Sequence, residues 1–118
     1  MTLLNREAVL KVQDTVTKDI AVPEWGGSIR VRTMTVAVRN EFARRASSED
    51  KVSVAAWLIS VLSVDENGEP LFKAEDIPEL ERRNFRAVDR VVQAILEING
   101  ISEKKVEEAA KNSKPIQS

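Results

Sequence analysis

Residues 20–42 read IAVPEWGGSIRVRTMTVAVRNEF, and this stretch contains the signals for a β-hairpin and the helix that follows it. Apolar side chains alternate with polar or small ones over residues 20–22 and again over residues 29–33, which is the period of half-buried β-strands. The pair Gly26-Gly27 lies between the two runs, and adjacent glycines favour a two-residue turn with positive φ angles. The pattern predicts an antiparallel hairpin over residues 17–34.

The first strand of this hairpin is expected over residues 20–25 and the second over residues 28–34. Pro23 has no amide proton to donate, so we expect the first strand to lie at an edge of the sheet. Thr35 then stands where an N-cap is needed, and it predicts a helix over residues 36–46.

Helical periodicity and capping residues predict further helices before and after this stretch. Asn5 is a suitable cap for the first of them, and Ser47 with Asp50 has capping-box spacing. Gly100 is suited to end a long helix after Asn99. These helices are expected over about residues 5–13, 48–64, 77–99 and 103–111. The predicted fold is mainly α with a small antiparallel β-hairpin (α+β), in a single compact domain of four to five helices over residues 1–112, followed by a flexible tail at 113–118.

The expected helix 77–99 opens with acidic residues and an early proline, which suit the positive end of a helix. Apolar side chains at helical spacing predict its inner stripe. The stripe consists of Phe85, Val88, Val92, Ile95 and Ile98, widened by Val91 and Leu96.

The expected helix 48–64 is apolar around most of its circumference. Between Val52 and Val64, only Ser53, Ser60 and Ser63 are polar. Such a helix must be covered on several sides, either by its own domain as a central core helix or, in part, by a binding partner at an association face.

The chain contains no cysteine, histidine or tyrosine. It therefore lacks thiolate nucleophiles, the commonest general base and the commonest metal ligand, and we expect no catalysis, no cofactor and no metal. The segment Asp65–Gly68 has the composition of a turn. A calcium loop with Gly68 at its sixth position would place Ala74, instead of glutamate, at the twelfth.

Charge and hydropathy exclude further classes. Eighteen basic and nineteen acidic side chains give a net charge of −1, which provides no overall attraction to nucleic acid or to anionic membranes. The N-terminal MTLLNRE reaches Arg6 before any apolar run develops, so we expect no signal peptide, and no stretch has the roughly 20 apolar residues of a membrane span. These features indicate a cytoplasmic protein.

Candidate partner-binding residues lie on the hairpin and on the helix 77–99. Trp25 beside the glycine turn is either an exposed contact residue or a ring packed on the hairpin or a neighbouring helix. Arg82, Arg86 and Arg90 recur every four residues, with Arg83 beside them, and form a basic ridge that either binds an acidic partner or is a solvated face with local ion pairs. The same two interpretations apply to Arg30 and Arg32 on the second strand.

Taken in order, the segments resemble the tail assembly chaperones of long-tailed bacteriophages, the short proteins encoded before the tape measure protein. The similar segments are the opening LLNREAVLK, the hairpin VPEWGGSIRVRTMT followed by VRNEF, WLISVLSVDENGEPLF, and the helix end EINGISE. The family pattern includes no catalytic or metal-binding residues, so the resemblance implies none in this chain.

The resemblance implies a protein that binds the tape measure protein before the tail tube assembles and is absent from the finished virion. It also implies a longer form, made by a ribosomal frameshift near residues 109–118, that recruits the tail tube protein. A coating of many copies along one long client favours weak homo-oligomerisation in the host cytoplasm. The alternative is a small adaptor that binds one folded partner. An exposed, compact patch around Trp25 would favour the adaptor, whereas a continuous groove along the helices 48–64 and 77–99 would favour the chaperone.

Overall fold

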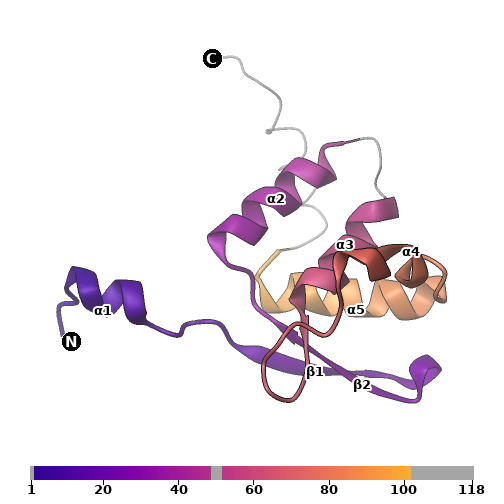
Figure 1. The fold of residues 1–118 in the computed structure, drawn as a ribbon, viewed down its shortest axis with the longest axis horizontal. Coiled ribbons are helices and arrows are strands. Elements are labelled where there is room, and N and C mark those ends of the chain that lie inside the picture. Colours follow the sequence, from indigo (N-terminus) through magenta and orange to yellow (C-terminus); the bar gives the residue numbers. More distant parts are fainter. Residues whose placement is uncertain (1, 49–51, 102–118) are drawn as a thin grey trace.

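The computed structural model describes residues 2–48 and 52–101, and these form an α+β domain (Figure 1). The elements follow one another as α1 (Arg6–Lys11), β1 (Thr17–Val22), the 3₁₀ helix η1 (Pro23–Trp25), β2 (Gly27–Arg32), α2 (Val36–Ala46), α3 (Val52–Leu62), β3 (Ser63–Val64), the 3₁₀ helix η2 (Ala74–Asp76), α4 (Ile77–Leu80) and α5 (Phe85–Ile98). The predicted fold class is confirmed.

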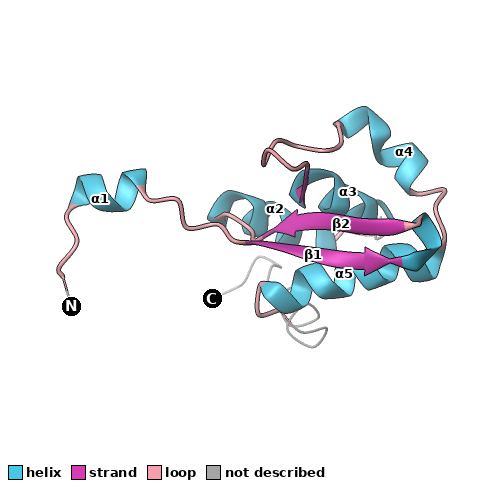
Figure 2. Ribbon diagram, turned by 90° about the horizontal axis from the view of Figure 1, so that it is seen from below, coloured by secondary structure: helices cyan, strands magenta, loops and turns pink. Residues whose placement is uncertain are grey.

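The three strands form an antiparallel sheet in the order β1-β2-β3. The register pairs Ile20 with Ile29, so the alternation seen in the sequence points one apolar face inward. Helix α3 packs against β2 and α5 packs against β1, both on that face (Figure 2). The domain is therefore a two-layer arrangement of helices on one side of a small sheet.

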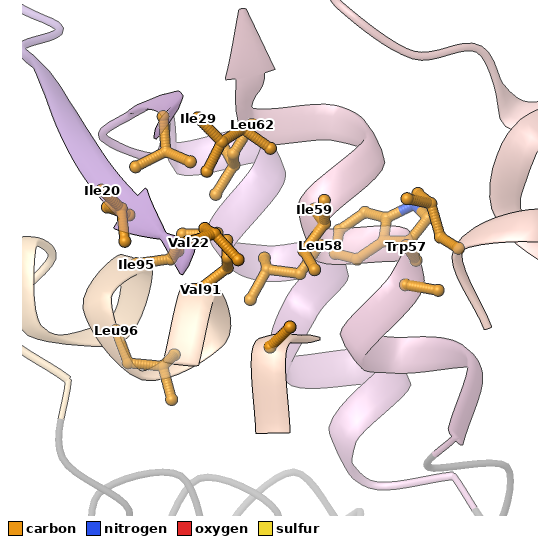
Figure 3. Close-up of a cluster of buried hydrophobic side chains, with 14 of the residues drawn as sticks. Ile20, Val22, Ile29, Trp57, Leu58, Ile59, Leu62, Val91, Ile95 and Leu96 are labelled. Carbon is orange, nitrogen blue, oxygen red and sulfur yellow. The ribbon is translucent and has the colours of Figure 1, made fainter. Parts of the chain in front are cut away.

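Helix α3 lies at the centre of the core. Leu58, Ile59 and Leu62 are fully buried there, and they meet side chains from the hairpin and from α5 (Figure 3). Ala55 and Val61 of the same helix are only partly buried. Of the two interpretations of this apolar helix, the core helix accounts for most of its surface, and a narrow side remains accessible.

Several predicted boundaries are confirmed. Helix α2 has the predicted bounds, and the Thr35 hydroxyl accepts a hydrogen bond from the amide of Val38 at 3.2 Å. The Asn5 side chain caps α1 in the same way, accepting from the amide of Ala8 at 2.9 Å. Gly100 follows α5 with φ at 68°, as a glycine that ends a helix should.

The prediction of a two-residue hairpin turn was wrong. Strand β1 ends at Val22, and Pro23–Trp25 form a turn of 3₁₀ helix, after which Gly26 has φ at 75° and Gly27 begins β2. Proline has a fixed φ that suits the first position of a helix, and this preference decides the connection. Strand β1 is an edge strand as predicted, but Pro23 lies beyond its end.

The two long helices predicted after α2 are both shorter in the structure. Helix α3 ends at Leu62, because Ser63 and Val64 pair with β2 as a third strand. The predicted helix 77–99 is interrupted after Leu80, and Asn84 starts α5 by accepting a hydrogen bond from the amide of Ala87 at 3.1 Å. A strong cap inside a periodic pattern begins a new helix. The predicted helix 103–111, the capping box at Ser47–Asp50 and the tail 113–118 lie wholly or partly outside the described residues.

The inner stripe predicted for the helix 77–99 is confirmed at Val91, Ile95 and Leu96 and wrong at Phe85. The buried positions of α5 are Ala87, Val91, Ile95 and Leu96, whereas Phe85 is 79% exposed. Val88 and Val92 are only partly buried. Helix α5 thus has a buried apolar face and, beside it, a second apolar face that is open.

Candidate functional site

An apolar cleft of about 330 Å³ opens where α3, α4 and α5 meet. The walls are apolar and the rim carries charge. Ala55 and Ala56 of α3, Leu80 of α4, and Phe85, Val88 and Val92 of α5 line it, with Glu81, Arg83 and Asp89 at the rim. An apolar cleft with a few charged groups at its edge is the usual form of a protein or ligand docking site.

The local sequence explains why a cleft forms at this place. Ala55 and Ala56 have small side chains, so the early turns of α3 leave space against the neighbouring helix. The interruption between Leu80 and Phe85 turns the chain, and both side chains then face that space. From the sequence we considered a groove along the helices 48–64 and 77–99, but we did not identify these lining residues because we treated residues 77–99 as one helix. Asn84 was the signal, since asparagine favours N-cap positions.

Trp25 packs against the hydrophobic core and is half-buried. Of the two interpretations of this side chain, the structure supports the packed ring. Trp25 is therefore partly covered by its own domain, and it is not the fully exposed contact residue expected of an adaptor.

Arg90 joins α5 to the hairpin tip. Its guanidinium donates two hydrogen bonds to the Glu24 carboxylate, one of them from Nη2 to Oε2 at 2.9 Å. This hydrogen bonding holds the pKa of Glu24 below its ordinary value of 4.5, with a smaller contribution from the charge of Arg86. Arg90 thus fixes the position of α5 relative to the sheet.

The other residues of the predicted basic ridge are divided by the break before α5. Arg82 lies in the turn after α4 and pairs with Glu79 at 3.5 Å between exposed side chains. Arg83 lies at the rim of the cleft. Arg86 is exposed on α5. The four arginines therefore do not form one continuous stripe on a single helix.

Arg30 and Arg32 both make contacts within the domain. Arg30 faces Asp19 across the β1–β2 pair, with Nε and Oδ1 2.6 Å apart, and this hydrogen bond lowers the pKa of Asp19. Arg32 donates from Nη2 to the carbonyl of Val61 at 3.3 Å. That carbonyl belongs to the last turn of α3, where backbone acceptors have no helical partner. Both arginines thus stabilise the sheet and its junction with α3.

The acidic turn after β3 is a local structure. The Asp65 carboxylate accepts hydrogen bonds from the amides of Asn67 at 2.8 Å and Glu69 at 3.0 Å, and Gly68 has φ at 80°. Across residues 2–48 and 52–101, no three acidic, cysteine or histidine side chains are grouped so that they could hold a metal ion. No helix in these same ranges is both long enough and apolar enough to cross a membrane.

Comparison with known proteins shows similarity at the level of the fold. No family model and no curated protein matches the sequence. Among solved structures, the chain is similar to the one described as the structure of the bacteriophage HK97 tail assembly chaperone, over 83% of this chain and 94% of that chain, with a TM-score of 0.63 and 15% identity. The chain therefore has the fold of that chaperone, in agreement with the resemblance noted in its sequence.

Proposed function

We propose that this protein is a phage tail assembly chaperone that binds the tape measure protein and keeps it soluble until the tail tube assembles. The observation that supports the proposal most strongly is the shared fold with the HK97 chaperone, which extends over most of both chains. The ordered resemblance in sequence points independently to the same family.

The cleft supports a role in binding helices. A helix laid into an apolar groove is a common mode of recognition, and a chaperone for a long helical client needs surfaces of this kind instead of catalytic groups. We infer that the protein acts without catalysis and without a cofactor. The adaptor interpretation loses its favoured contact residue, because Trp25 packs against the core.

The remaining parts of the proposal follow from the same family. The protein would act in the cytoplasm of the infected bacterium, associate weakly with itself along its client and be absent from the mature virion. A frameshifted longer form would recruit the tail tube protein. Its junction would fall in residues 109–118, which lie outside the described residues.

Co-expression tests the central part of the proposal. The tape measure protein, which we expect to be encoded by a long, helix-rich reading frame after this gene, is expressed alone and together with this protein, and its soluble fraction is compared. We expect the client to be insoluble alone and soluble in a complex when the two are together. A client that remains insoluble, or that is soluble without forming a complex, would contradict the proposal.

The gene itself tests the frameshift. The nucleotide sequence from the codon of Glu107 onward should contain a slippery heptamer followed by an overlapping −1 frame. An ordinary stop codon with no overlapping frame would remove the longer form, and with it the proposed route to the tail tube protein.

A further inference from the structure

Helix α2 has one side that is open to solvent along its length. Its buried residues are Phe42 and Ala46, and its main packing partner is α3. Figure 1 shows α2 at the margin of the helical layer. The open side, called here the outer α2 face, consists of Val36, which is 78% exposed, Arg39, Asn40, Ala43 and Arg44. None of the residues that line the α3–α4–α5 cleft belongs to α2, so the two surfaces are separate.

The outer α2 face has the spacing of a coiled-coil seam. Val36, Asn40 and Ala43 follow one another at intervals of four and three residues, which is the spacing of successive d, a and d positions of a heptad. Arg39 and Arg44 then occupy the g and e positions that flank this seam. In a pair of helices, residues at these flanking positions form ion pairs with the partner and determine which helix binds.

The charge of α2 is not balanced within the domain. Three arginines against Glu41 give the helix a charge of +2. The Glu41 carboxylate accepts hydrogen bonds from Nε of Arg44 at 3.0 Å and from Nε of Arg45 at 2.7 Å, so one carboxylate serves two guanidiniums. Arg45 also lies over the Trp57 ring, 4.7 Å from its centroid. Arg39 makes no ion pair or side-chain hydrogen bond with the part of the chain that the structure describes. The outer α2 face therefore has positive charge that an acidic partner would complement.

We propose that the outer α2 face pairs with a helix of the tape measure protein that has acidic side chains opposite Arg39 and Arg44. This inference rests on the proposed function, in which the client is long and helical. Val36 supplies an apolar contact, and the short side chains of Asn40 and Ala43 let the two helices approach closely. Each such contact is weak, because exposed ion pairs contribute little, but a contact repeated along a long client gains from multivalency.

Charge reversal on α2 tests the contact with the client. The R39E/R44E protein and the wild type are compared for binding to immobilised tape measure protein by surface plasmon resonance at low salt. We expect the dissociation constant of the variant to be about tenfold higher, and the difference to shrink at high salt because exposed charges are screened. The control is K18E/K73E, which reverses two exposed lysines outside α2 and should bind as the wild type does. Circular dichroism checks that both variants keep the fold.

Designed helices test the chemistry of the partner directly. Two labelled peptides of about four heptads carry leucine at a and d, and they differ only in having glutamate or lysine at e and g. Binding is measured by fluorescence anisotropy. We expect the glutamate peptide to bind the wild type and to bind R39E/R44E at least tenfold more weakly, and the lysine peptide not to bind the wild type.

The possible failures of the contact and of the proposed function can be distinguished. A wild-type protein that does not bind the client would refute the proposed function, and with it this contact. A wild type and an R39E/R44E variant that bind the client equally well, or two peptides that bind the wild type equally well, would refute the contact alone. A variant whose own mass in solution changes while its client binding does not would show that α2 joins copies of this chain, and this result would also overturn the proposal.

Discussion

The N-terminal arm, defined as residues 2–15, and helix α3 are both rich in apolar residues, yet every residue of the arm is exposed and α3 forms the centre of the core. Leu10 in α1 is 66% exposed, whereas Leu58 in α3 has no exposed surface. The difference arises from what surrounds each helix. Helix α3 packs against α2, α4, α5 and β2, while no residue of α1 is buried. Apolar composition alone therefore does not decide whether a helix stabilises the fold or is available to a partner.

A leucine-to-alanine substitution in each of the two helices should give the largest difference in the free energy of unfolding. Leu58→Ala should lower the free energy of unfolding by about 2–5 kcal/mol, because it leaves a cavity in a packed core. Leu10→Ala should change it by less than about 0.5 kcal/mol, as expected for an exposed site. Urea unfolding at low protein concentration measures both values. Equal losses would mean that the arm packs on the domain in solution.

Removal of the two asparagine caps should change stability by an intermediate amount, and only the cap of the packed helix should matter. Asn84→Ala should cost about 1 kcal/mol of stability, because α5 then starts with an unsatisfied amide inside the folded domain. Asn5→Ala removes an equivalent hydrogen bond from α1, but α1 is not packed on the domain, so global unfolding should not change. The unfolding midpoints of the two variants, compared with that of the wild type, measure both stability changes. An Asn5 variant as destabilised as the Asn84 variant would refute the separation of arm and domain.

Ser63 tests how well the packed region tolerates a polar group. It is fully buried, and its hydroxyl has no hydrogen-bond partner within the described residues. Ser63→Ala should therefore be neutral or stabilise the protein by up to about 1 kcal/mol. Ser60→Ala is the matched control, because the Ser60 hydroxyl donates to the carbonyl of Trp57 at 2.7 Å. Destabilisation of the Ser63 variant beyond the Ser60 variant would show that the Ser63 hydroxyl has a partner.

The smallest expected effect is the pH dependence of the contact between Glu24 and Arg90. The pKa of Glu24 is lower in the folded protein than its ordinary value of 4.5, so the folded state binds this proton less tightly than the unfolded state does. The stabilisation is complete above pH 4.5 and is lost as the pH falls through the lowered pKa. Glu24→Gln should flatten this part of the stability–pH curve, measured by thermal unfolding. An unchanged curve would mean that the pair is not formed in solution.

Much of the fold could be predicted from the sequence, because local signals agree with the final packing. The alternation predicted the antiparallel hairpin, although not the end of its first strand, and the Thr35 cap predicted α2 with the correct bounds. The ends of α3 at Leu62 and of α4 at Leu80 were not predicted, because the apolar pattern continues past both residues. Helix α3 ends where β3 pairs with β2, and α4 ends at the turn before Asn84. Tertiary contacts, and not the intrinsic propensities of the residues, determine where these helices end.

The candidate site was harder to predict than the fold. Arg30, Arg32, Arg86 and Arg90 were placed on the right elements, whereas Arg82 and Arg83 lie in the turn before α5 and Trp25 lies in η1. Of the seven candidate residues, only Arg83 lies at the cleft. Arg30, Arg32 and Arg90 make contacts that hold the domain together. Charge spacing along a sequence does not show which ions pair with distant residues, such as Arg90 with Glu24. The cleft depends on the turn between α4 and α5, and the apolar pattern of residues 77–99 gives no sign of that turn.

The most direct test of the proposed function is the mass of the complex formed with the tape measure protein. The two proteins are co-expressed, purified together through a tag on the client, and measured by light scattering coupled to gel filtration. We predict a complex that contains several copies of this chain on each client. A client that purifies without this chain would contradict the chaperone function, and a one-to-one complex would contradict the coating.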